Sequence, residues 1–178
     1  MSRTPHVLRA AALTGRLPLL LLLGCAASGV LADPPVVVDS QSIIHSLKPE
    51  PVTRGLVVAP RRAGGLSLDI RFASDSDRLT ASAHAQLEQL CAALNSPELS
   101  RGRFLIAGHT SATGSDAHNL RLSQARARAV RAYLLAHFGI AAERLEATGY
   151  GSSRPLPNFP PNSLQQRRVE ISALPATS

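Results

Sequence analysis

The sequence predicts an α/β fold, a β-α-β-α-β-β sandwich with its helices packed on one face of a mixed sheet. Short apolar or alternating segments, typical of strands, are interrupted by two longer segments in which apolar residues recur every three or four positions, as in helices. Hydrophobic residues make up 44% of the 178 residues and charged residues 17%, which indicates a globular rather than a disordered chain. These observations define the fold class.

The first strand and the first helix lie in the N-terminal half of the predicted domain. Apolar and polar residues alternate over residues 66–72, which predicts a strand with one buried face. Thr80 is expected to cap the helix that follows, in which apolar residues recur at helical spacing as far as Leu94. Cys91 belongs to this spacing and is expected to be a small, buried hydrophobic residue. An Asn-Ser-Pro sequence at residues 95–97 ends the helix.

Four further elements complete the predicted order. A short apolar run that ends in a glycine predicts a buried strand, and a long helix closed by a glycine follows it. Two short strands, separated by a loop rich in glycine and proline, complete the sheet. These elements are the strand 104–107, the helix 116–138, the strand 145–150 and the strand 168–171. We place the domain at residues 65–175.

The first 24 residues are typical of a signal peptide. A basic stretch precedes an apolar run at residues 17–23, which is too short to cross a bilayer, where about 20 residues are needed. Leu22-Leu23-Gly24-Cys25 resembles a bacterial lipobox, so Cys25 is expected to carry lipid, palmitate included, as the first mature residue. Ala26, in place of aspartate, resembles lipoproteins sorted to the outer membrane. Alternatively, ordinary signal peptidase would cleave after Ala32 and release a soluble periplasmic protein.

Residues 25–64 are expected to form a proline-containing tether. Prolines and polar residues alternate there with valine clusters, and one short strand is expected near residues 56–58. A disulfide between Cys25 and Cys91 is possible in the periplasm, although acylation of Cys25 would exclude it.

One arginine of the long helix lies on its apolar side. Arg126 is four residues from both Leu122 and Val130, so it shares their face. An unpaired guanidinium on a core-facing stripe is strongly unfavourable, so Arg126 needs an anionic partner. That partner is either an internal carboxylate, such as Asp75 or Asp116, or a carboxylate of a ligand held by the guanidinium fork.

Several motifs in the right order resemble the OmpA-like C-terminal peptidoglycan-binding domain. They are IAGHTSATGSDAHNLRLSQARARAVRAYL, GIAAERLEATGYGSSRP and QQRRVEI. The family pattern is a strand ending in GHTD, a glycine loop, then N-x-x-LS-x-x-RA-x-x-V at the start of a helix, followed later by a GYG turn and an NRRVEI strand. The resemblance covers residues 66–174.

The resemblance implies noncovalent binding of the peptidoglycan stem peptide at its diaminopimelate. In the family, the arginine of LS-x-x-RA meets a ligand carboxylate and the aspartate of GHTD meets the ligand ammonium. Arg126 occupies the arginine position. The other residues that the resemblance implies at the site are Phe72, Thr110, Ser111, Asn119, Ser123 and Arg168.

Two positions depart from the family pattern. Ser111 stands where the family has the aspartate of GHTD, and Gln166 replaces the asparagine before the arginine pair. A serine hydroxyl brings no charge, and a neutral hydrogen bond is about half as strong as a charge-assisted one. Weak binding of the ammonium is therefore expected, unless a carboxylate such as Asp116 substitutes.

Other functions have little support in the sequence. His109, Ser111 and Asp116 are residue types of a catalytic triad, but they lie within eight positions on a strand end and a loop, and no G-x-S-x-G motif is present. His109 and His118 lack the spacing of metal ligands. The net charge of +7 is spread over dispersed arginines with few aromatic residues, which does not favour nucleic-acid binding. We expect no enzyme activity, cofactor or metal site.

The sequence thus predicts a lipoprotein on the periplasmic face of the outer membrane that ties this membrane to the cell wall. The alternative is an interaction module of the same fold, with weakened or no peptidoglycan binding, that serves a protein partner in an envelope assembly.

Overall fold

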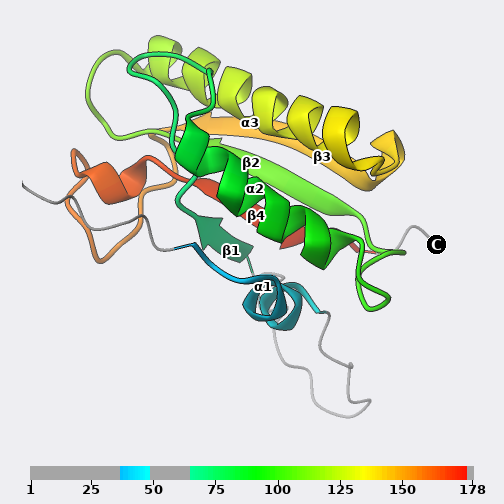
Figure 1. The fold of residues 1–178 in the computed structure, drawn as a ribbon. Helices are drawn as coiled ribbons and strands as arrows, with labels where there is room; N and C mark the ends of the chain where they lie inside the picture. Colours follow the sequence, from blue (N-terminus) through cyan, green and yellow to red (C-terminus); the bar gives the residue numbers. More distant parts are fainter. Residues whose placement is uncertain (1–36, 49–64, 176–178) are drawn as a thin grey trace, which may run out of the picture. The chain divides into compact units, whose positions relative to one another are not determined.

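The computed structural model describes residues 37–48 and 65–175 (Figure 1). The predicted signal peptide, the acylated Cys25, the alternative cleavage after Ala32 and the strand near residues 56–58 lie outside the described residues.

A four-stranded mixed sheet carries the described domain. Its strands are β1 (Gly65–Leu68), β2 (Phe104–His109), β3 (Leu145–Gly151) and β4 (Val169–Ala173). They lie in the order β1-β4-β2-β3, with β4 antiparallel to both neighbours and β2 parallel to β3. The register places Ile106 of β2 opposite Ile171 of β4 and Ala147 of β3.

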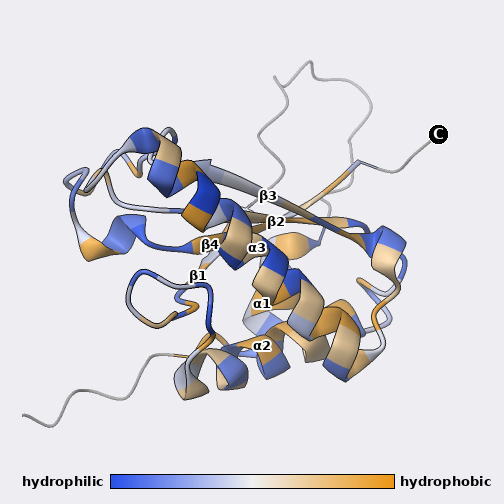
Figure 2. Ribbon diagram, turned by 90° about the horizontal axis from the view of Figure 1, so that it is seen from above, coloured by the Kyte–Doolittle hydropathy of each residue, from blue (hydrophilic) through white to orange (hydrophobic). Residues whose placement is uncertain are grey.

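The two long helices, α2 (Ala81–Leu94) and α3 (Asp116–Phe138), pack on the same face of this sheet (Figures 1 and 2). Their apolar side chains and those of the strands below them form one core, because each element is apolar on one side only. Members of this core with at most 1% exposure include Leu87, Leu90, Leu94, Phe104, Ile106, Val130, Leu134 and Ile171. The predicted α/β class, with helices on one face of a mixed sheet, is confirmed.

The ends of the long helices lie where the sequence predicts them. Thr80 occupies the N-cap of α2, and Asn95 follows its last residue. Ser115 caps α3, its side chain accepting a hydrogen bond from the His118 N–H, and Gly139 ends α3 in the left-handed conformation, with φ of 63°. Two short 3-10 helices, η1 (Ala142–Arg144) and η2 (Leu164–Gln166), precede β3 and β4.

The first strand is shorter than predicted. β1 ends at Leu68, although the alternation of burial continues to the buried Ile70. Phe72 pairs only with Leu79, in an isolated bridge that closes the loop between β1 and α2. Phe72 is therefore on a loop beside α3 rather than within the sheet.

Two glycines let the N-terminal half of α3 lie directly on the sheet. A Cβ atom at Gly108 or Gly149 would collide with the α3 backbone at Ser123 or Gln124. Ser123 is fully buried here, and its Oγ accepts a hydrogen bond of 2.9 Å from the Gly151 N–H. This close contact fixes the position of the next turn of α3, which carries Arg126.

A third helix, α1 (Ser40–Leu47), lies within the segment that the sequence predicts as a tether. Ile43, Ile44 and Leu47 are buried and belong to the same core as the sheet and α2. The buried Gln86 of α2 accepts a hydrogen bond from the Val38 N–H (2.8 Å) and donates one to the Val38 carbonyl (3.0 Å). The structure thus corrects the tether prediction for residues 37–48. None of the described helices has the length and apolar character that crossing a membrane requires.

Candidate functional site

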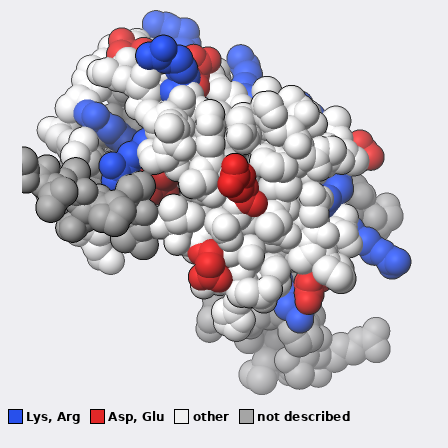
Figure 3. Space-filling model, viewed as in Figure 1, with Lys and Arg blue, Asp and Glu red and all other residues white. Residues whose placement is uncertain are grey.

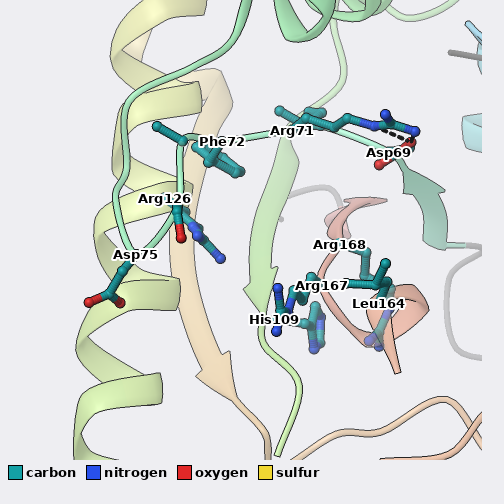
Figure 4. Close-up of a pocket in the computed structure, with 12 residues that line it drawn as sticks. Asp69, Arg71, Phe72, Asp75, His109, Arg126, Leu164, Arg167 and Arg168 are labelled. Carbon is teal, nitrogen blue, oxygen red and sulfur yellow. Dashed lines mark hydrogen bonds and ion pairs between the residues drawn. The ribbon is translucent and has the colours of Figure 1, made fainter. Parts of the chain in front are cut away.

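Two adjoining hollows, of about 240 and 280 Å³, lie beside the N-terminal half of α3 and share Arg126 and Arg167. We call them together the arginine groove. Arg126 comes from α3, Arg167 from the residues between η2 and β4, and Asp75 from the loop between β1 and α2 (Figure 4). The groove therefore unites segments that are far apart in the chain.

Arg126 is half-buried and lacks an acidic partner among the described residues. Its Nε donates a hydrogen bond of 2.9 Å to the Ser76 carbonyl, and its guanidinium carbon lies 4.9 Å from the centre of the Phe72 ring. Burial, together with the nearby charge of Arg167, lowers the pKa of Arg126, although Asp75 and Asp77 act in the opposite direction. A carboxylate in the groove would offset the free-energy cost of holding the charged guanidinium in this half-buried position near Arg167.

Neither internal carboxylate that the sequence suggested pairs with Arg126. Asp75 lies 2.8 Å from Nε2 of His118, and Asp116 accepts a hydrogen bond of 3.0 Å from the Ser152 hydroxyl. Asp116 does not line the groove, so it is poorly placed to hold a ligand there. Neither Asp75 nor Asp116 is therefore the ion-pair partner of Arg126, and a ligand carboxylate is the other alternative.

The buried stripe of α3 differs from the predicted one. It consists of Asn119, Ser123, Ala127, Val130 and Leu134. Leu122 and Arg126 are partly exposed and lie beside this stripe. Arg126 therefore enters the groove from the edge of the buried face, where its stem is covered and its guanidinium is accessible.

Ser111 lies at the other end of the groove, next to Arg167. Only 2% of Ser111 is exposed, and its hydroxyl forms a hydrogen bond of 2.8 Å with that of Thr113. Nε of Arg167 donates a hydrogen bond of 3.2 Å to Ser111 Oγ. Sequence reasoning missed Arg167 as a site residue, although the QQRRVEI motif contains it.

Thr110 and Asn119 also line the groove. Asn119 is buried, and its Nδ2 donates a hydrogen bond of 3.0 Å to the Thr113 carbonyl, which holds the loop before α3. Thr110 Oγ1 is buried without a hydrogen-bond partner among the described residues. Arg126, Phe72, Thr110, Ser111 and Asn119 are thus brought together.

Two predicted site residues have structural roles. Ser123 lies beneath α3, as described above, and does not reach the groove. Arg168 lines a wall of the groove, but only 7% of it is exposed and its guanidinium lies 2.7 Å from Glu170. It also donates to the carbonyls of Arg154 and Gln166. The polar groups of both side chains are bonded internally, and a part of either residue in ligand binding stays a prediction.

The model of the OmpA family matches residues 71–168, which is more than half of the chain. The chain belongs to the OmpA family. Outer membrane protein P5 of Haemophilus influenzae is 32% identical over 122 residues, which are 67% of this chain and 34% of that protein. Outer membrane protein A of Shimwellia blattae is 34% identical over 109 residues, which are 61% of this chain and 45% of that protein. The chain thus spans less than half the length of these relatives.

A solved structure shares the fold. The peptidoglycan-associated lipoprotein from Burkholderia pseudomallei is 30% identical, with a TM-score of 0.50 over 59% of this chain and 88% of that chain. The family has members that bind peptidoglycan, and homologues of this chain are structural or binding proteins of the outer membrane or envelope rather than enzymes.

His109 of this OmpA-family domain belongs to a buried polar cluster beneath the groove. It is 2% exposed, and its Nε2 lies 3.6 Å from Glu170 Oε2. His109, with a further contribution from Arg168, lowers the pKa of Glu170 to about 2, although burial opposes this shift. His109 forms no hydrogen bond with Ser111 or Asp116, so the three triad-type residues are not arranged as a catalytic relay.

The face of the molecule in Figure 3 has no large patch of one charge. Figure 3 shows one face on which charged side chains of both signs are scattered among uncharged ones. In the described part of the chain, no three His, Cys, Asp or Glu side chains cluster as metal ligands would. The groove is thus the feature best suited to ligand binding.

Proposed function

We propose that this chain binds peptidoglycan noncovalently through the arginine groove and, anchored by a lipid at Cys25, ties the outer membrane to the cell wall from its periplasmic side. The single observation that carries the proposal is Arg126. It is half-buried over Phe72, has no acidic partner among the described residues, and occupies the arginine position of the family motif. A ligand carboxylate would complete its charge-assisted hydrogen bonds.

The proposed ligand is the stem peptide of peptidoglycan, held at its diaminopimelate. Its carboxylate would meet Arg126, with Thr110, Ser111 and Asn119 along the rest of the groove. Phe72 supports the guanidinium from below by a cation–π contact. No catalytic step is part of this proposal, because the binding is noncovalent.

The deciding experiment is a pull-down on isolated sacculi with Arg126→Ala. We expect binding to fall about ten- to a hundredfold, which is the value of a hydrogen bond to a charged group. Arg121→Ala is the matched control, because Arg121 is exposed on the same helix and does not line the groove. Circular dichroism and a thermal melt show whether the fold is intact.

Two results would contradict this role of Arg126. Unchanged binding by a folded Arg126→Ala protein would mean that the ligand carboxylate lies elsewhere. Loss of the fold would mean that Arg126 is structural, and Arg126→Lys, which keeps a charge and an apolar stem, would then separate folding from binding.

A second candidate function is docking of a protein partner in an envelope assembly. A neighbouring hollow of about 480 Å³ is lined in part by Leu156, Phe159 and Leu164, and Leu164 is 70% exposed. An exposed apolar surface beside a binding groove favours a protein contact. Failure of the wild-type protein to bind sacculi would favour this candidate.

A further inference from the structure

We infer that the Ser111–Arg167 end of the arginine groove binds a second carboxylate, so that this chain prefers a stem peptide with two free carboxylates and does not require the ligand's ammonium. This inference rests on the proposed function. It concerns which charged groups of the ligand the groove binds, because position 111 is a serine and not an aspartate.

The contacts of Ser111 indicate that its end of the groove attracts anions. Its hydroxyl oxygen accepts a hydrogen bond from Arg167 Nε at 3.2 Å and forms another with Thr113 at 2.8 Å. A ligand ammonium at this point would meet the positive charge of Arg167 and a neutral hydroxyl that already accepts a hydrogen bond from that guanidinium. Like charges at such distances repel each other, whereas a carboxylate would be attracted.

Arg167 has donors to spare. A guanidinium has five N–H donors, and the bond to Ser111 uses one of them. Within the described part of the chain, no carboxylate lies within ion-pair distance of Arg167. Arg126 and Arg167 line the same two hollows, and the charge of Arg167 contributes to lowering the pKa of Arg126. An anionic ligand that bridges them would relieve the repulsion between their charges.

Three acidic residues around the groove have partners of their own. Asp69 lies 3.0 Å from Arg71, and Glu170 pairs with Arg168. Asp75 lines both hollows, but it lies 2.8 Å from His118, and in Figure 4 its carboxylate points toward α3 and away from the Arg126 guanidinium. Asp75 and Asp77 act on Arg126 by their charge. Among the described residues, however, no carboxylate forms an ion pair with Arg126 or Arg167, so both guanidinium groups keep N–H donors for a ligand carboxylate.

The stem peptide can supply both carboxylates. Diaminopimelate whose main-chain carboxyl is in an amide bond presents one, at the end of its side chain, which we assign to Arg126. The γ-linked glutamate before it presents a free α-carboxylate, which we assign to Arg167. Amidation of that second carboxylate would remove its charge while keeping its size. The preference is therefore open to a direct chemical test.

The experiment titrates the purified protein with synthetic stem tripeptides that end in diaminopimelate, with the N-terminal amine acylated and the main-chain carboxyl of diaminopimelate amidated, so that two carboxylates and one amine stay free. One peptide is unmodified, one has its free amine acetylated, and one has the glutamate α-carboxylate amidated. We expect acetylation to change the dissociation constant less than about twofold, and amidation to weaken binding about ten- to a hundredfold. Arg167→Gln should abolish the difference between carboxylate and amide, whereas the control Arg121→Gln should keep it.

Ser111→Asp provides the converse test. The added carboxylate would pair with Arg167, and this end of the groove would then favour a ligand ammonium over a carboxylate. We expect acetylation of the ligand amine to weaken binding of this variant about tenfold or more, although it leaves the wild type unaffected.

Two outcomes would overturn the inference while leaving peptidoglycan binding in place. One is that the wild type binds the acetylated peptide more weakly than the unmodified peptide, and that Asp75→Asn binds the unmodified peptide equally weakly. Asp75 would then hold the ammonium. The other is equal binding of the amidated and unmodified peptides. If the wild type bound neither sacculi nor any of the peptides, the proposed function itself would fail.

Discussion

The hydrogen-bond acceptors around an arginine side chain in the folded protein decide whether the residue is structural or free to bind a ligand. Arg144 donates hydrogen bonds of 2.8 to 3.0 Å to the carbonyls of Leu94, Leu99 and Gly102, and thereby holds the end of α2. Arg168 is paired with Glu170. Arg126 has one carbonyl and an aromatic face, so most of its donors point to the groove.

Glu170 leads to a prediction about stability and pH. Its pKa in the folded protein is about 2, below the usual 4.5, so the folded state binds this proton less tightly than the unfolded state. The resulting stabilisation is complete above about pH 4.5 and is lost as the pH falls toward 2, a change on the order of 3 kcal/mol in the free energy of unfolding. Urea titrations between pH 7 and pH 2.5 measure it.

Glu170→Gln should flatten this pH dependence and also destabilise the protein at pH 7, because Arg168 loses its charged partner. Glu88→Gln, at an exposed position on α2, is the control and should keep the wild-type slope. A wild-type slope in Glu170→Gln would mean that other carboxylates carry the acid sensitivity.

At the level of elements, α1 is part of the folded domain. Ile43 is fully buried, and Gln86 of α2 binds both backbone groups of Val38 just before the helix. We expect Ile43→Ala to lower the free energy of unfolding by about 2–4 kcal/mol, the usual cost of removing a large buried side chain. Denaturant unfolding of the purified protein measures this loss.

The exposed Ser46 of the same helix supplies the control, and Ser46→Ala should leave stability within about 0.5 kcal/mol of the wild type. Equal stability of Ile43→Ala and Ser46→Ala would show that residues 37–48 do not pack on the domain. The original tether prediction would then hold for these residues as well.

The proposed function of the whole molecule needs two attachments, one to lipid and one to the cell wall. Cys25, by its lipobox, would provide the first, and the arginine groove the second. Metabolic labelling with palmitate should mark the wild type and Arg126→Ala but not Cys25→Ser. Conversely, sacculus binding should survive Cys25→Ser and be lost in Arg126→Ala.

This separation of the two effects tests the tethering role directly. Palmitate in both the wild type and Cys25→Ser, or in neither, would contradict acylation at Cys25. Absence of palmitate from both proteins would agree with cleavage after Ala32 and a soluble periplasmic protein.

The sequence by itself determined the order of the elements, the ends of α2 and α3, and the presence of Arg126 in α3. These features depend on residues that are close in the chain. Ser115 and Gly139 mark the ends of α3 through local hydrogen bonds and a left-handed turn, and Arg126 lies in a motif within the same helix. Periodicity over a few turns is sufficient to predict them.

Only the tertiary structure decided which polar groups meet. Arg167 lies 56 positions from Ser111, and Val38 lies 48 positions from Gln86, so local patterns do not relate them. The choice between Arg167 and Arg168 as the residue facing the groove followed from the strand pairing that brings Glu170 beside His109 and Arg168. The free energy of a buried charge depends on its surroundings in space, which is why the binding site took its final form only in the folded chain.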